Sequence, residues 1–394
     1  MTIDMFDFKL STRLVFGPGT VTRVGSIAGD LGMTRPLLVA DSGIRNAGHV
    51  EHVIRLLTAA GLDVEVFDQF SVNPDSAMVD RGVAFASTLN RDSVIGLGGG
   101  SSLDCAKGIN LLLTNGGQVA DYRGYGHAPN PLMTMIAIPT TAGTGSEAQS
   151  YAVISDTTTH LKMACGDPKL VFSTAILDPN LTLSQPTFVT AASGFDAIAH
   201  AVETAVTTRR TEISTLFSRE AFRLLNANYE RVLTDPDNLQ ARSAMQLGAF
   251  YAGVAIEQSM LGAAHACANP LTARYQLTHG AALAIRWGGL DRVDREPSRQ
   301  GRHQELLDQA PGTGDTHGRG PIPRVRRSTR HCREWPGFYD VLPRRRRCTT
   351  LLPSAARTRG TVVDAGFPDG YGCSWGDVGS PASSWILDSL RRGQ

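Results

Sequence analysis

Short apolar runs alternate with helical patterns through the first half of the chain, at a spacing of roughly 25–35 residues. Strands are expected at 8–16, 36–41, 63–68, 93–98 and 133–141. Helices are expected at 20–31, 47–60, 75–89 and directly after the glycines that follow residue 97. A run such as PLLVAD (36–41), apolar at every position until a final acid, is typical of a parallel strand buried on both faces. The alternation therefore predicts an α/β domain with a parallel, helix-covered sheet.

From about residue 186 the pattern changes. Three long helical patterns follow one another at about 187–205, 212–232 and 238–262, with no strand between them. This arrangement predicts a second, all-helical domain. We expect domain boundaries of 1–185 for the α/β domain and 186–285 for the helical one.

Residues 286–394 have a different composition. They contain 19 Arg, no Lys and 12 acidic residues, whereas residues 1–285 contain four Lys, 15 Arg and 25 acidic residues. Leu, Ile, Val and Phe account for only 18 of the 109 residues in this tail, which is too few to build a core. An Arg-rich, Lys-free sequence favours a frameshift in a GC-rich gene just after Ile285. The alternative is a basic, disordered arm for nucleic acid or membrane, centred on 344–347.

Whole-chain properties exclude several classes of protein. A net charge of +1 argues against binding of polyanions, so no nucleic-acid partner is expected. Six cysteines in 394 residues are too few for a disulfide scaffold. The N-terminus has no signal peptide, and no uncharged apolar stretch reaches about 18 residues. These features predict a cytoplasmic protein without a membrane span.

Small and polar residues follow three of the expected strands and could bind a cofactor. Gly98, Gly99, Gly100 and Ser101 lie between a strand and a helix, where free N–H groups attract a phosphate. The alternative is a tight structural turn, because the GxGxxG pattern is absent. Thr140, Thr141, Thr144 and Ser146 form a second such segment, which could equally be a polar loop. Asp41 ends a strand and could accept ribose hydroxyl groups or simply cap a helix.

Metal-ligating residue types occur in the helical region. Asp196 and His200 are four residues apart on a helical pattern and therefore lie on one face. His265 and His279 follow further along the chain. One carboxylate with three imidazoles suits Fe²⁺ or Zn²⁺, whereas any single histidine is more often a surface or core residue.

Residues 8–285 resemble the iron-containing (group III) alcohol dehydrogenase family. The matching segments are FGPGT (16–20), GLGGGSSLDCAKGI (96–109), AIPTTAGTGSE (137–147), LKMACGDPKLVFSTAILDPNLT (161–182), GFDAIAHAVE (194–203) and GAAHACANPLTARYQLTHGAALAI (262–285). The resemblance implies a dehydroquinate synthase-like architecture, with a Rossmann-like domain before a helical one. It assigns the metal to Asp196, His200, His265 and His279. It assigns the cofactor to the residues of the two strand-end segments and to Asp41, Asn73 and Lys162.

Two departures from the family pattern stand out. Asn269 occupies the position where many members carry a further histidine near the nicotinamide, so a proton relay through that position is in doubt. The expected remainder of the helical domain is replaced by the tail, which implies a truncated domain.

The resemblance implies hydride transfer between a small alcohol or aldehyde and NAD, with NADP disfavoured by Asp41. Fe²⁺ is the expected metal, with Zn²⁺ as an alternative, and a homodimer is possible. Maleylacetate reductase and hydroxyacid–oxoacid transhydrogenase activities are alternatives within the family. A different alternative is an inactive remnant that retains dinucleotide or metal binding.

Overall fold

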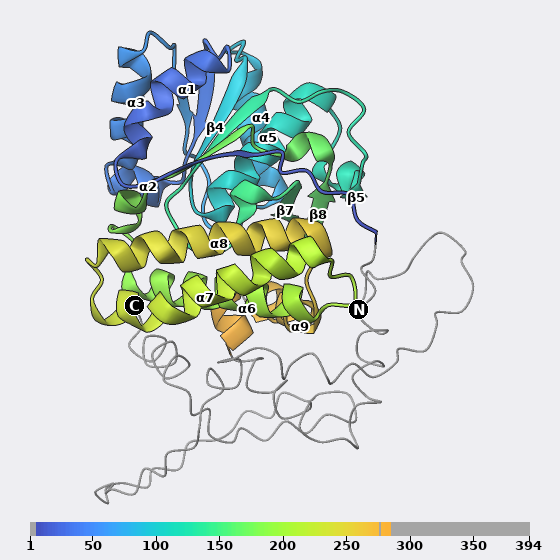
Figure 1. The fold of residues 1–394 in the computed structure, drawn as a ribbon. Coiled ribbons are helices and arrows are strands. Elements are labelled where there is room, and N and C mark those ends of the chain that lie inside the picture. Colours follow the sequence, from blue (N-terminus) through green and yellow to red (C-terminus); the bar gives the residue numbers. More distant parts are fainter. Residues whose placement is uncertain (1–4, 276, 285–394) are drawn as a thin grey trace, which may run out of the picture. The chain divides into compact units, whose positions relative to one another are not determined.

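The computed structural model describes residues 5–275 and 277–284 of the chain. Its N-terminal part is built on a six-stranded, all-parallel sheet in the order β1-β9-β6-β4-β2-β3 (Figure 1). The strands of this sheet are β1 (Arg13–Phe16), β2 (Pro36–Val39), β3 (Glu65–Phe67), β4 (Ser93–Gly98), β6 (Thr134–Pro139) and β9 (Thr174–Leu177). The predicted parallel α/β domain is thereby confirmed.

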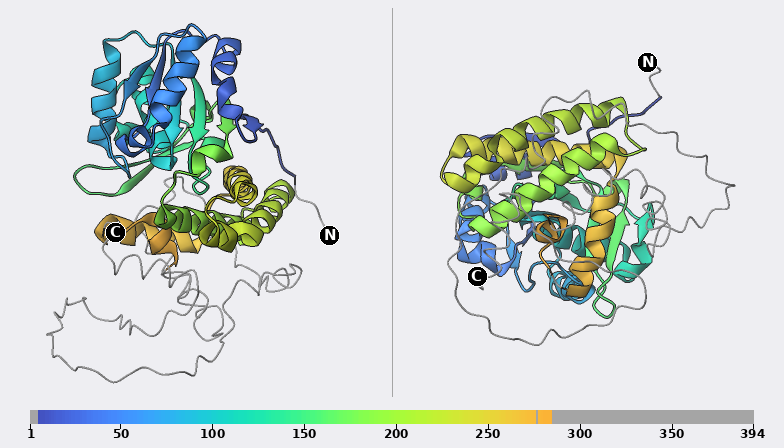
Figure 2. Two further views of the ribbon diagram at one scale, coloured as in Figure 1. Left: turned by 90° about the vertical axis from the view of Figure 1, so that its left-hand side faces the viewer. Right: turned by 90° about the horizontal axis from the view of Figure 1, so that it is seen from below.

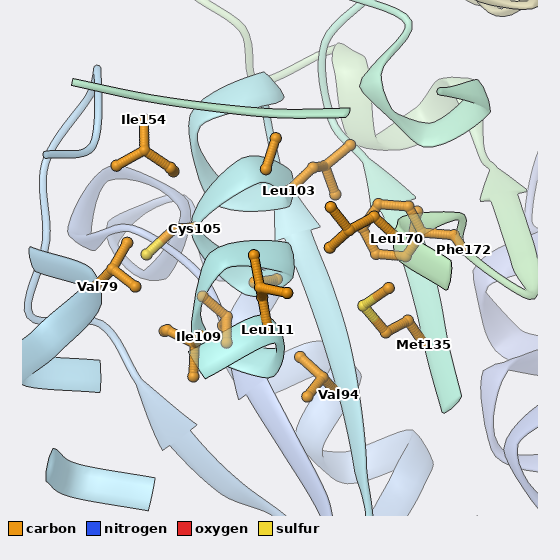
Figure 3. Packing of buried hydrophobic residues seen from close by; sticks show 14 of the residues in the cluster. Val79, Val94, Leu103, Cys105, Ile109, Leu111, Met135, Ile154, Leu170 and Phe172 are labelled. Atoms are coloured by element: carbon orange, nitrogen blue, oxygen red, sulfur yellow. The ribbon is translucent and has the colours of Figure 1, made fainter. Parts of the chain in front are cut away.

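Helices cover both faces of this sheet. They are α1 (Val24–Asp30), α2 (Ser42–Asn46), α3 (His49–Ala59), α4 (Ser76–Ser87) and α5 (Gly100–Asn115). Successive residues of a strand enter different cores: Leu37 packs in one hydrophobic cluster and Leu38 in the other. Figure 3 shows the first cluster around α5, where Leu103 and Ile109 are fully buried. Burial on both faces explains why these strands are apolar at every position.

A second, three-stranded sheet was not predicted. It has the order β5-β8-β7 and consists of β5 (Gly124–Tyr125), β7 (Tyr151–Ser155) and β8 (Lys162–Gly166). Exposed and buried residues alternate in β7 over only five positions. Such a short segment carries too little periodicity to be recognised in a sequence.

Several predicted boundaries also differ from the structure. The strand expected at 8–16 is shorter, because only Arg13–Phe16 pairs with β9 at the edge of the sheet. The helix expected at 20–31 begins as a 3₁₀ turn, η1 (Thr20–Arg23), before α1. Helix α2 was missed because its five residues are fewer than two turns, too short to show a helical period.

The second part of the described chain consists of helices, as predicted. These are α6 (Thr187–Val206), α7 (Glu212–Thr234), α8 (Leu239–Ser259) and α9 (Ala263–Tyr275), and residues 279–284 are also helical. Figures 1 and 2 show α8 lying next to the α/β part. Its Gln246 side chain donates to the carbonyl oxygen of Pro139 at 3.0 Å, and Glu257 accepts hydrogen bonds from Ser150.

Within the described residues, no helix is both long enough and apolar enough to cross a bilayer. The predictions made for the tail at 286–394, including a frameshift, disorder and a basic arm, fall outside the described residues.

Candidate metal and dinucleotide site

The carboxyl ends of β2, β4 and β6 meet at one edge of the sheet, since these strands are parallel neighbours. Asp41 follows β2, Gly98 ends β4, and Thr140 follows β6. The N–H of Thr140 donates to the carbonyl oxygen of Gly98 at 3.0 Å. Crevices outside the carboxyl ends of parallel strands are the usual binding place for ligands in such sheets. The sheet therefore brings the two predicted cofactor segments together.

Close contact between these two segments depends on glycine. A Cβ atom on Gly99 would lie 3.2 Å from Cγ2 of Thr141, and one on Gly100 would lie 2.6 Å from Cγ2 of Thr144. Gly98 has a φ of +139°, which side-chain-bearing residues rarely adopt. The glycines thus let the start of α5 pack against the second segment, in addition to leaving its N–H groups accessible.

Asp41 and Asn73 lie beside the glycine turn. The Asp41 carboxylate accepts hydrogen bonds from the N–H of Ile44 at 3.1 Å and from the hydroxyl of Ser102 at 3.0 Å. Asp41 therefore caps α2, the alternative role considered for it, while its carboxylate also contacts the start of α5. Asn73 has a φ of +55°, and its N–H donates to Oγ of Ser101 at 3.0 Å.

Two residues of α5, Asp104 and Lys107, hold the second strand-end segment in place through hydrogen bonds, and neither was predicted from the sequence. Lys107 is fully buried and donates to the carbonyl oxygens of Ser146, Gln149 and Tyr151 at 2.7–2.8 Å. Burial lowers the pKa of Lys107 to about 8, although the nearby Asp104 opposes that shift. The Ser146 hydroxyl donates to Asp104, so this predicted cofactor residue points into the protein.

The four predicted metal ligands converge on one oxygen atom. The Nε2 atoms of His200, His265 and His279 lie 3.3, 3.2 and 3.8 Å from Oδ1 of Asp196. Donor atoms of Asp196, His265 and His279 all lie within 4.8 Å of one another. Asp196, His200 and His265 are at most 5% exposed. Of the other histidines, His160 lies in the loop between β7 and β8, while His303 and His331 fall outside the described residues.

Small residues bring three helical segments close enough for this convergence. Ala199 of α6, Ala264 and Ala268 of α9, and Ala282 form one buried cluster with Leu283. At Gly280, next to His279, any Cβ atom would collide with the carbonyl oxygen of Ala192 in α6. The backbone that carries His279 thus lies directly against α6, and larger side chains at these contacts would move the helices apart.

The charges of the four ligands differ because their surroundings differ. Burial lowers the pKa of His200 to about 4 and that of His279 to about 3, although Asp196 opposes both shifts. Burial also disfavours a charged His265, but its hydrogen bonds to Asp196 and Glu203 raise its pKa to about 9. Burial would raise the pKa of Asp196, yet the surrounding histidines hold it well below its usual range. The site thus contains an ionised carboxylate and two neutral imidazoles.

This donor set fits a divalent cation. The Nε2 atoms of His200 and His279 lie toward the Asp196 carboxylate, and the rings of His200 and His265 stack with centroids 4.6 Å apart. Imidazole nitrogens with one carboxylate are preferred ligands of Zn²⁺ and of non-haem Fe²⁺. Binding of a cation would displace the proton between His265 and Asp196, as expected for ligands that must be deprotonated.

Glu203 contacts the metal site and was missed by sequence reasoning. Its carboxylate forms a short hydrogen bond with Nδ1 of His265. The sequence does carry a signal for this contact, because Glu203 follows Asp196 by seven residues, or two helical turns, on the same face of α6.

Lys162 and Asn269 complete the predicted residues. Burial lowers the pKa of Lys162, while attraction to Asp196 and Asp104 opposes the shift. Lys162 is therefore under the influence of carboxylates from both the metal site and α5. Asn269 lies on α9 one turn after His265, with its side chain half-buried.

The described residues combine a parallel α/β sheet with helices whose Asp196, His200, His265 and His279 form a candidate metal site. Residues 11–179 match the iron-containing alcohol dehydrogenase family, and residues 190–313 match the C-terminal domain of the Fe-containing alcohol dehydrogenase family. The chain belongs to this family. The match extends past residue 285, where the resemblance found in the sequence ended.

Individual proteins are also similar. The NAD-dependent methanol dehydrogenase of Bacillus methanolicus is 36% identical over 281 residues, covering 71% of this chain and 74% of the relative. The 1,3-propanediol dehydrogenase of Klebsiella pneumoniae is 34% identical over 287 residues, covering 72% and 74%. A crystal structure of 1,3-propanediol oxidoreductase superposes with a TM-score of 0.71 at 33% identity, covering 77% of this chain and 80% of that one.

Proposed function

We propose that this protein is an NAD-dependent, metal-dependent alcohol dehydrogenase acting on a small alcohol or aldehyde. The observation that carries the proposal is the convergence of three imidazole Nε2 atoms on one buried carboxylate oxygen. Similar proteins described as methanol and 1,3-propanediol dehydrogenases support the substrate class, and the former supports NAD as the cofactor.

The dinucleotide would bind at the carboxyl edge of the sheet. N–H groups at the start of α5 are free of intrahelical partners and would hold the pyrophosphate at Gly98–Ser101. Thr140, Thr141 and Thr144 would form the facing wall, with Ser146 supporting it from inside, and Lys162 would contact the cofactor. The Asp41 carboxylate and Asn73 would lie on the side of the adenosine ribose. A negative charge at Asp41 repels a 2′-phosphate, which favours NAD over NADP.

Asp196, His200, His265 and His279 would hold the metal, Fe²⁺ or alternatively Zn²⁺. When bound, the cation supplies Lewis acidity to an alcohol oxygen, and the dinucleotide accepts the hydride. The protein's own contribution is to hold three imidazole donors in place around a site that is more than nine-tenths buried at three of its four residues. Because Asn269 cannot accept and return a proton as histidine does, the alcohol proton would leave through water.

Purified full-length protein loaded with Fe²⁺ tests this proposal. We expect about one metal ion per chain and oxidation of NADH on addition of a small aldehyde. A folded protein that binds no divalent metal would contradict it. Measured rates with alcohols, maleylacetate and hydroxyacid–oxoacid pairs would separate the activities known in the family.

The composition of residues 286–394 favours a second candidate, an inactive remnant that still binds dinucleotide or metal. Stoichiometric metal without turnover would support it. Sequencing of the gene tests its origin: a change of reading frame within the part that encodes residues 286–394 is expected, and one continuous frame would contradict it. The main proposal also includes a cytoplasmic location and a possible homodimer, as expected from the sequence.

A further inference from the structure

Helix α9, which carries His265, begins without a capping side chain of its own. The residue before the helix is Gly262, which has no side chain to accept the free N–H groups of the first turn. These N–H groups are instead bound by Glu203 of α6. Oε1 of Glu203 accepts a short hydrogen bond from the N–H of Ala264 and a second, at 3.4 Å, from the N–H of His265. The start of α9 is thus attached to α6 by one carboxylate.

The other oxygen of the same carboxylate reaches the imidazole ring. Oε2 of Glu203 bonds Nδ1 of His265, while Nε2 of this ring faces Asp196 at 3.2 Å. An ionised carboxylate can only accept hydrogen bonds, so Nδ1 must carry the proton. Nε2 is then the nitrogen that can bind a metal once the proton it shares with Asp196 is displaced.

Glu203 is buried, and the hydrogen bonds described above compensate its carboxylate for the loss of water. The residue is 5% exposed, and a buried carboxylate is costly unless it is hydrogen-bonded. Gly262 fits closely against it, since a Cβ at that position would lie 3.1 Å from Oε1 of Glu203. Helix α6 therefore presents Asp196, His200 and Glu203 from one face.

We propose that Glu203 is a positioning residue of the metal site, which fixes both the backbone and the tautomer of His265 so that Nε2 faces the metal. This inference depends on the proposed metal-binding function and extends it to a residue that is not itself a ligand.

The test replaces Glu203 by glutamine in the full-length chain. The amide oxygen can still accept the N–H of Ala264, but the NH₂ group opposite Nδ1 can only donate. Nδ1 would then have to present its lone pair, and the proton would move to Nε2. We expect Glu203→Gln to weaken Co²⁺ binding about 10–100-fold, measured by chelator competition and by the visible spectrum of the bound ion.

Glu257→Gln is the matched control. Glu257 also accepts a backbone N–H, that of Ser150, but contacts none of the four predicted ligands. Its Co²⁺ affinity should equal that of the unmodified protein. Equal affinity of folded Glu203→Gln and unmodified protein would overturn the role of Glu203 alone, and so would equal losses in both variants. Failure of the unmodified protein to bind Co²⁺ would overturn the metal site as well.

If Glu203→Gln does not fold, the unmodified protein still decides the question. Nitrogen-15 NMR of the Zn²⁺-loaded protein should show His265 protonated at Nδ1 and bound to metal through Nε2. Metal coordination through Nδ1 would overturn the proposal.

Discussion

The dinucleotide edge and the metal site both depend on small residues, but the two regions are assembled differently. At the edge, Gly98–Gly100 lie within one strand–turn–helix unit, and hydrogen-bonded parallel strands fix the position of that unit. At the metal site, the ligands come from three segments up to 83 residues apart, from Asp196 to His279, which meet through alanine and glycine contacts. Backbone hydrogen bonds between strands tolerate a changed side chain better than does a helix contact that only small residues permit. The metal site should therefore be the more sensitive region.

The largest effect is expected from a substitution that separates α6 from the segment carrying His279. Gly280→Val places a branched side chain against the carbonyl oxygen of Ala192. We expect loss of measurable Co²⁺ binding and destabilisation of about 1–3 kcal/mol or more, measured by denaturant unfolding. Gly29→Ala in α1 is the control, because a Cβ there meets nothing within 4 Å. Normal metal affinity in Gly280→Val would show that the close helix contact is not needed.

A smaller effect is expected from removal of a single ligand. His200→Ala should weaken metal binding roughly 100-fold. Converted to free energy, this loss is about one quarter, or somewhat less, of the binding energy of about 10–16 kcal/mol that is typical of a structural Zn²⁺ site. Dinucleotide binding, measured by NADH fluorescence, should not change, since His200 lies in the other region. His52→Ala in α3 serves as the control. Loss of NADH binding in His200→Ala would mean that the two regions do not act separately.

The edge of the sheet should respond to charge more than to shape. Asp41→Asn keeps an oxygen that can cap α2 but removes the negative charge next to the predicted ribose position. We expect the ratio of NADP to NAD affinity to rise about tenfold. Asp75→Asn, which changes the equivalent cap of α4 through Met78, should leave the ratio unchanged. An unaltered ratio in Asp41→Asn would leave this residue with the capping role alone.

The smallest effect concerns Glu147, in the 3₁₀ turn η3 (Ser146–Ala148), which continues the second strand-end segment. Burial raises the pKa of Glu147 to about 7, from an ordinary value of 4.5. The folded protein therefore binds more protons than the unfolded chain between these two values, and its stability should fall as the pH rises through that window. Glu147→Gln should lack this loss and exceed the unmodified protein by on the order of 1 kcal/mol at pH 8. Unfolding free energies measured at pH 5 and pH 8 test this, with the exposed Glu230→Gln as the control. Parallel pH curves for Glu147→Gln and the unmodified protein would contradict the prediction.

Much of the fold could be predicted because its signals are local. The central strands are apolar at every position, and α6, α7 and α8 begin within a residue of their predicted starts. The elements that were missed are α2, β9, α9 and the β5-β8-β7 sheet. All but α9 are short, so their patterns are weak, and α9 was expected to continue the helix that ends at Ser259. Spacing identified Asp196 and His200 as a pair on one helix face, but it did not reach Glu203 one turn further along the same face.

By itself, the sequence determined which functional residue types occur where along the chain. Glycines and hydroxyl groups follow strands, and one acid and three histidines lie in the helical region. Only the tertiary structure decided that the two strand-end segments touch, that Ser146 points inward to Asp104, and that His265 is held by Glu203. Residue types and helical periodicity are local properties and can be recognised in a sequence. Convergence of side chains from separate helices depends on how closely their backbones approach, and that distance is set by packing between residues far apart in the chain.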